Sequence, residues 1–203
     1  MRIIGGIAVC SRLLLLDTTP TLSDDIYRYV WDGHVQAAGL NPYSYAPEDE
    51  ALIELRNDDW VKINHAELVT VYPPVAQWFF HGVQHFTPGV TGMKAALVVC
   101  DVLLLLVLWR WLLARRQDGR RVLLYAWHPL PVLEIAGNGH VDVLGVLAVC
   151  LALLWLHQGR YHAGVWALAA AVLSKLIPIL CAAAFWQHLA RPESAGWLRA
   201  LDP

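Results

Sequence analysis

Five apolar segments decide which class of fold is open to this chain of 203 residues, and they lie at 3–16, 95–114, 122–136, 141–157 and 163–186. A helix needs about 20 residues, at 1.5 Å each, to cross the roughly 30 Å hydrocarbon core of a bilayer. Segment 95–114 has that length. Only 16% of the residues are charged, whereas soluble domains carry about 25%. We therefore expect an all-α membrane protein.

The shorter apolar segments also fit a membrane protein. No small-residue cleavage site follows segment 3–16, because its leucine run meets Asp17 directly. A first transmembrane helix is therefore a better interpretation than a signal peptide. Segment 122–136 contains two prolines, and broken helices at membrane depth usually line a cavity. Together the segments predict a multi-spanning helical bundle.

Charge is divided unevenly along the chain. The stretch from Asp17 to Gly92 holds eleven acidic and three basic residues, while the remainder holds six acidic and twelve basic ones. The basic run "RRQDGRR" at 115–121 is expected in the cytoplasm, which makes 17–92 a long extracytoplasmic first loop. This distribution does not indicate a nucleic-acid partner.

The same topology places three polar features on the outer side: "SDDIYRY" (23–29), "GNGHVD" (137–142) and Lys175. It also divides the chain into three parts. These are a first transmembrane helix (1–16), the extracytoplasmic loop with juxtamembrane helices (17–92), and a transmembrane bundle that is the N-terminal part of a larger one (93–203).

The outer loop carries signals for two helices. Ser23 is expected to cap the first helix, which ends through Gly39 and the Asn41-Pro42 pair. The second begins at Pro73-Pro74, in "YPPVAQWFFHGVQHF". It is amphipathic and too short to span a bilayer, so we expect it to lie in the membrane interface.

The first of these helices places reactive side chains on one face. Asp25, Arg28, Tyr29 and Asp32 follow the i, i+3, i+4, i+7 spacing. A carboxylate there could act as a general base while the arginine holds an anionic group such as a phosphate. The alternative is that Asp24 and Asp25 only complement the helix dipole, which contributes about 0.3–1 kcal/mol.

Further ionisable residues stand near the predicted membrane. Glu134, His140 and Asp142 lie at the outer ends of two short helices, where the alternative to a functional site is a polar turn. Asp101 and Lys175 lie within apolar segments, where each needs a partner or water. Either they form an ion pair, or Lys175 binds a lipid-linked phosphate. No metal site is expected at these positions.

Several blocks, taken in order, resemble a known family. They are "SDDIYRYVWDG", "AAGLNPYSYAP", "INHAELVTVYPPVAQWF", "WHPLPVLEIAGNGHVD" and "LSKLIP". Together they resemble integral-membrane glycosyltransferases of the GT-C fold. The nearest likeness is to bacterial mannosyltransferase-like members that use polyprenyl-phosphate sugars.

The resemblance implies roles for particular residues. The catalytic acid of the first outer loop maps onto Asp25, while Asp24 fits the pattern less cleanly. The acid of the second outer loop maps onto Asp142, with Glu134 as the alternative. Lys175, with a proline shortly after it, matches a phosphate-binding position. Arg28, Tyr29, Asp32 and His140 complete the expected substrate-binding set.

The resemblance also implies a reaction. A hexose, expected to be mannose, moves with inversion from a polyprenyl-phosphate donor to a lipid or glycan acceptor on the extracytoplasmic side. The enzyme is expected in the bacterial inner (plasma) membrane as a multi-pass protein, facing the periplasm or cell exterior and surrounded by membrane lipids. A divalent cation, Mg or Mn, is a possible cofactor. Such enzymes have about twice as many helices, so a fragment, a split gene product or a degenerate copy is expected.

Two other classes remain open from the residues alone. The intramembrane charges could form the ion path of a transporter or flippase half, although no inverted repeat is visible. A non-catalytic membrane assembly partner is the third possibility.

Overall fold

The computed structural model describes residues 2–183 and 185, and within this part of the chain every regular element is helical, with no strand. The predicted all-α class is therefore confirmed there. In chain order the elements are α1 (Arg2–Leu13), α2 (Asp25–Ala37), η1 (Glu50–Leu55), η2 (Trp60–Lys62), α3 (Pro74–Phe86), α4 (Val90–Ala114), η3 (Gly119–Val122), α5 (Leu123–Ala126), α6 (Pro129–Pro131), η4 (Val132–Gly137), α7 (Asp142–His157), α8 (Tyr161–Ser174) and η5 (Ile177–Cys181).

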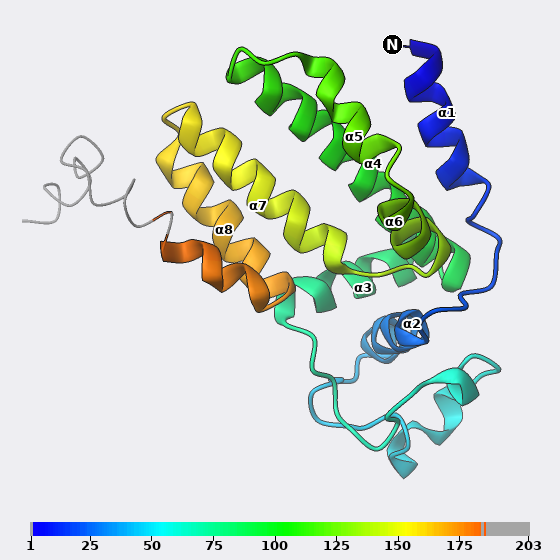
Figure 1. The fold of residues 1–203 in the computed structure, drawn as a ribbon. Coiled ribbons are helices and arrows are strands. Elements are labelled where there is room, and N and C mark those ends of the chain that lie inside the picture. Colours follow the sequence, from blue (N-terminus) through cyan, green and yellow to red (C-terminus); the bar gives the residue numbers. More distant parts are fainter. Residues whose placement is uncertain (1, 184, 186–203) are drawn as a thin grey trace, which may run out of the picture.

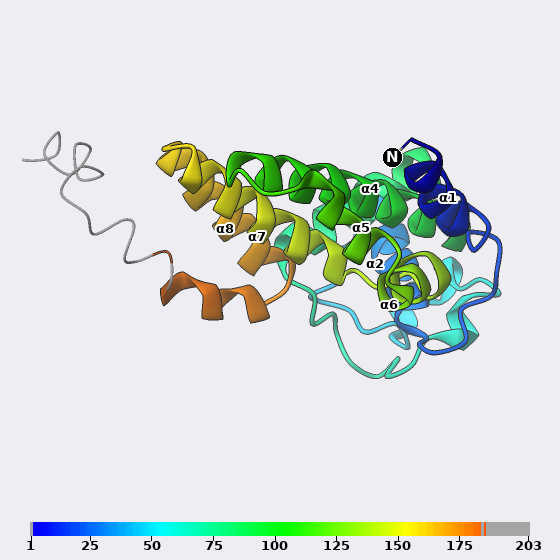
Figure 2. The same ribbon diagram turned by 45° about the horizontal axis from the view of Figure 1, so that its top comes forward.

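The longer helices lie side by side, and the outer-loop segment covers one end of them. In Figure 1, α7 runs between α4 and α8, while α2, α3 and the chain between them gather below. Figure 2 shows the same grouping from a second direction. The start of α4, the start of α7 and the end of α8 all lie toward this covered end. The three polar features that were predicted to share one side therefore lie at one end of the helices.

Among the described residues, α4 is the single helix that is both long and apolar enough to cross a membrane. It has 25 residues, and its most apolar window has a mean hydropathy of 2.3. The apolar helices α7 and α8 have 16 and 14 residues, and α1 has 12. All three are shorter than the span of about 20 residues. A multi-spanning bundle and the three-part division of the chain thus stay predictions.

Two of the apolar segments are broken, as the prolines indicated. Segment 122–136 is divided among η3, α5, α6 and η4, and the His128 side chain accepts a bond from the Leu130 amide where α6 begins. Helix α8 ends at Ser174 because Lys175 is extended, with φ −155° and ψ 139°. The chain then continues into η5, while the last residues of segment 163–186 lie partly outside the described residues.

Helix α2 ends as its turn chemistry predicts and begins one residue later than expected. Ser23 lies before the cap position, which Asp24 occupies, and its hydroxyl accepts a bond from the Asp25 amide. At the other end, Gly39 has φ +79°. The amides of Gly39 and Leu40 donate to the carbonyls of Gln36 and Val35, which is the Schellman arrangement.

Helices α2 and α3 cross closely at Gly33. A Cβ atom there would lie 2.5 Å from the carbonyl oxygen of Phe80, so only glycine fits. Next to the crossing, the rings of Tyr29 and Phe80 stack with centroids 4.8 Å apart. The ring of Tyr72 stands edge-on to both. This aromatic cluster joins the two outer helices and the chain that precedes α3.

A buried ion pair connects α1 to the bundle. Arg12 pairs with Asp101, and both side chains are fully buried. The Tyr125 hydroxyl donates to the other carboxylate oxygen over 2.7 Å. The sequence alternative of an Asp101–Lys175 pair is therefore wrong, because Lys175, directly after α8, pairs with Asp142 at the start of α7.

Candidate functional site

The two acids at the start of α2 have different surroundings. Asp24 is exposed, whereas Asp25 is half-buried in the first turn of the helix. A carboxylate in a first helical turn is stabilised by the helix dipole. Asp25 therefore combines a charge-stabilised position with partial shielding from water.

Two tyrosines lie next to Asp25. Burial, with the negative charge of Asp25 as the next cause, raises the pKa of Tyr72 to about 12. The pKa of Tyr29 is raised mainly by burial and further by Tyr72 and Asp25, while the main chain of Val141 opposes the rise. The rings of Tyr29 and Tyr72 have centroids 4.9 Å apart. Both phenols thus stay protonated at neutral pH beside the carboxylate.

Asp32 and Arg28, also on α2, form a buried network. Arg28 Nε donates to one carboxylate oxygen of Asp32 over 2.8 Å. Thr70 Oγ1 and Gln77 Nε2 donate to the other over 2.5 and 2.7 Å. Burial raises the pKa of Asp32 against the opposing effect of Arg28 and of these hydrogen bonds. Arg28 also donates to the Leu68 carbonyl.

Arg28 and Asp32 therefore have a structural role in this network. Both are almost fully buried, with 6% and 1% exposure. They hold the chain before α3 against α2. Their predicted contact with substrate stays a prediction.

The second polar segment is tied to the first by Asn138. Its side-chain oxygen accepts from the amides of Thr21 and Leu22 over 3.1 and 3.0 Å, and its amide donates to the Leu133 carbonyl. The next residue, Gly139, has φ +76°, and a Cβ atom there would lie 2.2 Å from the Ile26 side chain. The "GNGHVD" turn therefore fits directly against the start of α2.

The predicted residues of this segment form two pairs. Lys175 Nζ donates to Asp142 Oδ1 over 2.5 Å, and the two side chains are 39% and 46% exposed. His140 Nε2 lies 3.6 Å from Glu134 Oε2, which is too long for a hydrogen bond. Asp142 and Lys175 thus form a solvent-accessible charge pair, one residue beyond the Val141 main chain that faces Tyr29.

The structure brings these predicted residues to one end of the molecule. Tyr29 and Val141 belong to the same buried apolar cluster, and Asp142 of the Asp142–Lys175 pair directly follows Val141. Sequence reasoning missed Tyr72, Thr70 and Gln77, which complete the surroundings of α2. The only signal for Tyr72 was its place directly before the two prolines that begin α3.

Lys94 is a further residue that the sequence did not single out. It is fully buried near the start of α4, and its ammonium donates to the carbonyls of Leu15 and Thr18 over 2.6 and 2.7 Å. These carbonyls follow α1, so Lys94 fixes the chain that leads from α1 toward Asp25.

The arrangement of acids does not fit a ready-made metal site. In the part of the chain that the structure describes, no three His, Cys, Asp or Glu side chains stand close enough together to hold a metal ion. His81 and His85 lie on α3 at the spacing of a metal pair, but no third ligand from the described residues joins them.

The start of α2, which carries Asp25, and the Asp142–Lys175 pair thus lie toward one end of the helices. A sequence model described as alpha-(1->6)-mannopyranosyltransferase, N-terminal domain, matches residues 7–191. The chain therefore belongs to this family of mannosyltransferases, which are glycosyltransferases. The predicted enzyme class is confirmed, and membership favours it over a transporter or an assembly partner.

No curated protein and no solved structure matches the chain.

Proposed function

We propose that the protein transfers mannose from a polyprenyl-phosphate donor to a glycan or lipid acceptor at the extracytoplasmic face of a membrane, with inversion at the anomeric carbon. Family membership supports the sugar and the reaction class. The observation that carries the proposed site is the position of half-buried Asp25 beside Tyr72, at the end of the helices where Asp142 and Lys175 also lie.

Asp25 is the proposed general base. It accepts the proton of an acceptor hydroxyl while the hydroxyl oxygen attacks the anomeric carbon of the donor sugar. The bond between that carbon and the phosphate oxygen breaks, and its electron pair leaves with polyprenyl phosphate. Asp24, the neighbouring acid, is the alternative base.

Lys175 is the proposed partner of the leaving phosphate. Its ammonium is partly exposed and is bonded to Asp142, so it can exchange a carboxylate for a phosphate oxygen. A fixed positive charge stabilises the negative charge that develops on a leaving group. Arg28 stabilises the site indirectly, through its ion pair with Asp32. Tyr29 keeps α2 in contact with the segment that contains Asp142.

The proposed orientation follows from the two ends of α4. Its first residues lie beside the outer-loop segment, and the basic run at 115–121 follows its last residue. Because basic runs are retained in the cytoplasm, Asp25 belongs on the opposite side. That side is where a lipid-linked sugar donor would be used.

Donor choice tests the proposal. Membranes containing the full-length protein are supplied with radiolabelled polyprenyl-phosphate mannose or with nucleotide-activated mannose, in the presence of an α-(1→6)-linked mannoside acceptor. We expect label in the acceptor from the lipid-linked donor alone. Transfer from the nucleotide sugar under conditions that block polyprenyl-phosphate mannose formation would contradict the proposal.

A further inference from the structure

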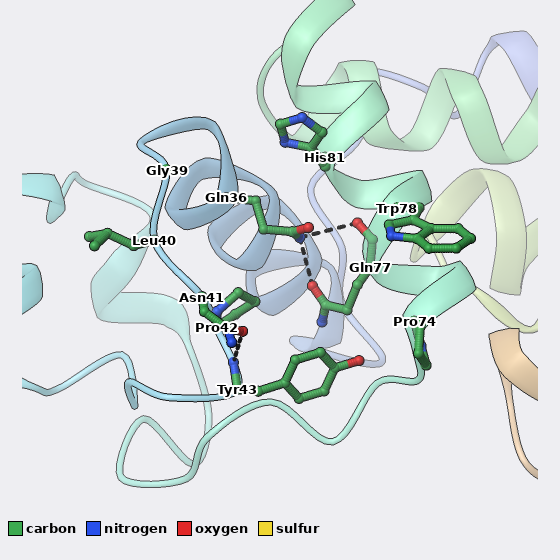
Figure 3. A pocket seen from close by; sticks show the side chains of 10 residues that line it. All are labelled: Gln36, Gly39, Leu40, Asn41, Pro42, Tyr43, Pro74, Gln77, Trp78 and His81. Atoms are coloured by element: carbon green, nitrogen blue, oxygen red, sulfur yellow. Dashed lines mark hydrogen bonds between the residues drawn. The ribbon is translucent and has the colours of Figure 1, made fainter.

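A pocket of about 380 Å³ opens between the end of α2 and the first turns of α3 (Figure 3). This volume is within the range of roughly 300–1,000 Å³ typical of ligand pockets. The turn after α2 supplies one wall and α3 supplies the other. In Figure 3 the amides of Gln36 and Gln77 lie in the middle, Tyr43 lies on one side, and Trp78 and His81 lie on the other.

Two aromatic side chains in this pocket are unusually accessible. Trp78 is 72% exposed and Tyr43 is 44% exposed. Aromatic rings provide a large apolar surface with a polar tip. Such rings suit the carbon-bound hydrogens on the face of a pyranose sugar, which is apolar although its edge carries hydroxyl groups.

Hydrogen bonds to neighbouring residues fix the side-chain amides of the pocket in place. Gln36 Nε2 donates to the side-chain and main-chain oxygens of Gln77 over 2.7 and 3.1 Å. Gln77 Nε2 in turn donates to Asp32 and Thr70. Fixed amides present hydrogen-bonding groups without the entropic cost of ordering them on binding.

Several polar atoms of the lining have no partner within the described part of the chain. They are Gln36 Oε1, Asn41 Nδ2 and Trp78 Nε1. The same described lining contains no Asp, Glu, Lys or Arg. Neutral donors and acceptors beside aromatic faces suit a neutral polyhydroxy ligand better than a phosphate or a cation.

A chain of contacts leads from the pocket toward the proposed catalytic acid, which stands at the other end of α2, about 16 Å along the helix from Gln36. The Tyr43 hydroxyl, on the pocket wall, donates to the main-chain oxygen of Tyr72 over 2.7 Å. The Tyr72 ring stands edge-on to the ring of Tyr29 with centroids 4.9 Å apart, and Tyr29 lies one helical turn after Asp25 on the same face of α2. A sugar chain seated in the pocket could therefore extend past Tyr72 and present its end to Asp25.

We infer that this pocket is an acceptor subsite, which holds a mannose unit of the growing glycan while the terminal hydroxyl reacts at Asp25. The identity of the sugar rests on the proposed function. The existence of the pocket and the neutral, aromatic character of its lining do not depend on the proposed function. The competing role for Trp78 is anchorage in the membrane interface, which would not depend on a sugar bound in the pocket.

Binding of α-(1→6)-linked mannotriose to the full-length protein in lipid nanodiscs, measured by titration calorimetry, tests the inference. We expect the wild type to bind, and Trp78→Ala to weaken binding by at least about tenfold, because truncated aromatic anchors dominate such losses. Trp78→Phe should restore most of the affinity, since it returns an aromatic face.

Phe86→Ala is the matched control. Phe86 is 80% exposed on the same helix and lies outside the pocket lining, so its loss should leave mannotriose binding unchanged. Asp25→Asn leaves the pocket lining intact, so it should still bind mannotriose while transfer is lost, and binding without transfer separates this inference from the proposed chemistry.

Three outcomes would overturn the subsite. The first is that the wild type binds no mannotriose. The second is that Trp78→Ala binds mannotriose as tightly as Phe86→Ala does. The third is that Trp78→Ala only reduces the amount of protein in the membrane, which would assign Trp78 to lipid anchorage.

Discussion

Neighbouring acids on α2 have different surroundings. The sequence shows Asp24 and Asp25 side by side, and the family resemblance favours Asp25 but leaves Asp24 as an alternative. In the structure Asp24 is exposed and Asp25 is half-buried beside two phenols. A half-buried carboxylate is shielded from bulk water and can face the hydroxyl of a bound acceptor, so these surroundings favour Asp25 as the proposed base.

Titration of Tyr72 gives the first prediction. Its folded-state pKa is about 12, above the ordinary tyrosine value of about 10. The contribution of Tyr72 to stability is therefore complete below about pH 10 and is lost as the pH rises through about 12. We expect the melting temperature of the wild type to fall more steeply over this interval than that of Tyr72→Phe. Parallel curves from differential scanning fluorimetry would refute it.

The buried Arg28–Asp32 pair gives a second prediction. Removing one partner of a buried ion pair leaves the other charge without compensation, at a cost of about 3–5 kcal/mol. Asp32→Ala should therefore lower the melting temperature of the protein substantially. The matched control is Asp59→Ala, which removes the carboxylate of a partly exposed pair with Lys62 and should change stability little. Equal effects of the two substitutions would show that the Asp32 network is not stabilising.

At the scale of elements, local turn chemistry made much of the fold predictable. The end of α2 at Gly39, the start of α3 at a proline pair and the break near Pro129 follow from backbone preferences that act over a few residues. The long apolar helix α4 follows from composition and length. All of these signals are contained within short windows of sequence.

Pairings between distant segments were not predictable in the same way. Lys175 was the expected partner of Asp101, whereas the packing of α1 against α4 pairs Asp101 with Arg12. The bonds from Thr70 and Gln77 to Asp32 likewise depend on how the outer chain folds back. No spacing rule connects residues so far apart.

The contact between the two polar segments gives a prediction at this scale. Asn138→Ala removes the acceptor of the Thr21 and Leu22 amides, at a cost of about 1–3 kcal/mol for groups left unsatisfied. We expect faster hydrogen exchange in the peptide that contains these amides. Asn57→Ala is the control, because exposed Asn57 also accepts two amide bonds, from Asp59 and Trp60. It should speed exchange only near those residues, and unchanged exchange at Thr21 and Leu22 in Asn138→Ala would contradict the contact.

At the scale of the whole molecule, the uneven distribution of charge corresponds to the two ends of the helices. The acidic segment covers the end where α4 begins, and the basic run follows the end of α4. This agreement supports the proposed orientation, with acceptor subsite, Asp25 and Lys175 on one side. The family was predictable because several ordered blocks of sequence carry it together, whereas the subsite depends on surfaces that α2 and α3 create only when folded.

The most direct test of the proposed site compares Asp25→Asn with Asp24→Asn in full-length protein. Transfer from radiolabelled polyprenyl-phosphate mannose is measured in membranes that contain equal amounts of each variant. Loss of a general base costs roughly 10²–10⁴-fold in rate, so we expect that reduction for Asp25→Asn and near wild-type transfer for Asp24→Asn. Full transfer by Asp25→Asn would contradict the assignment of Asp25 as the base.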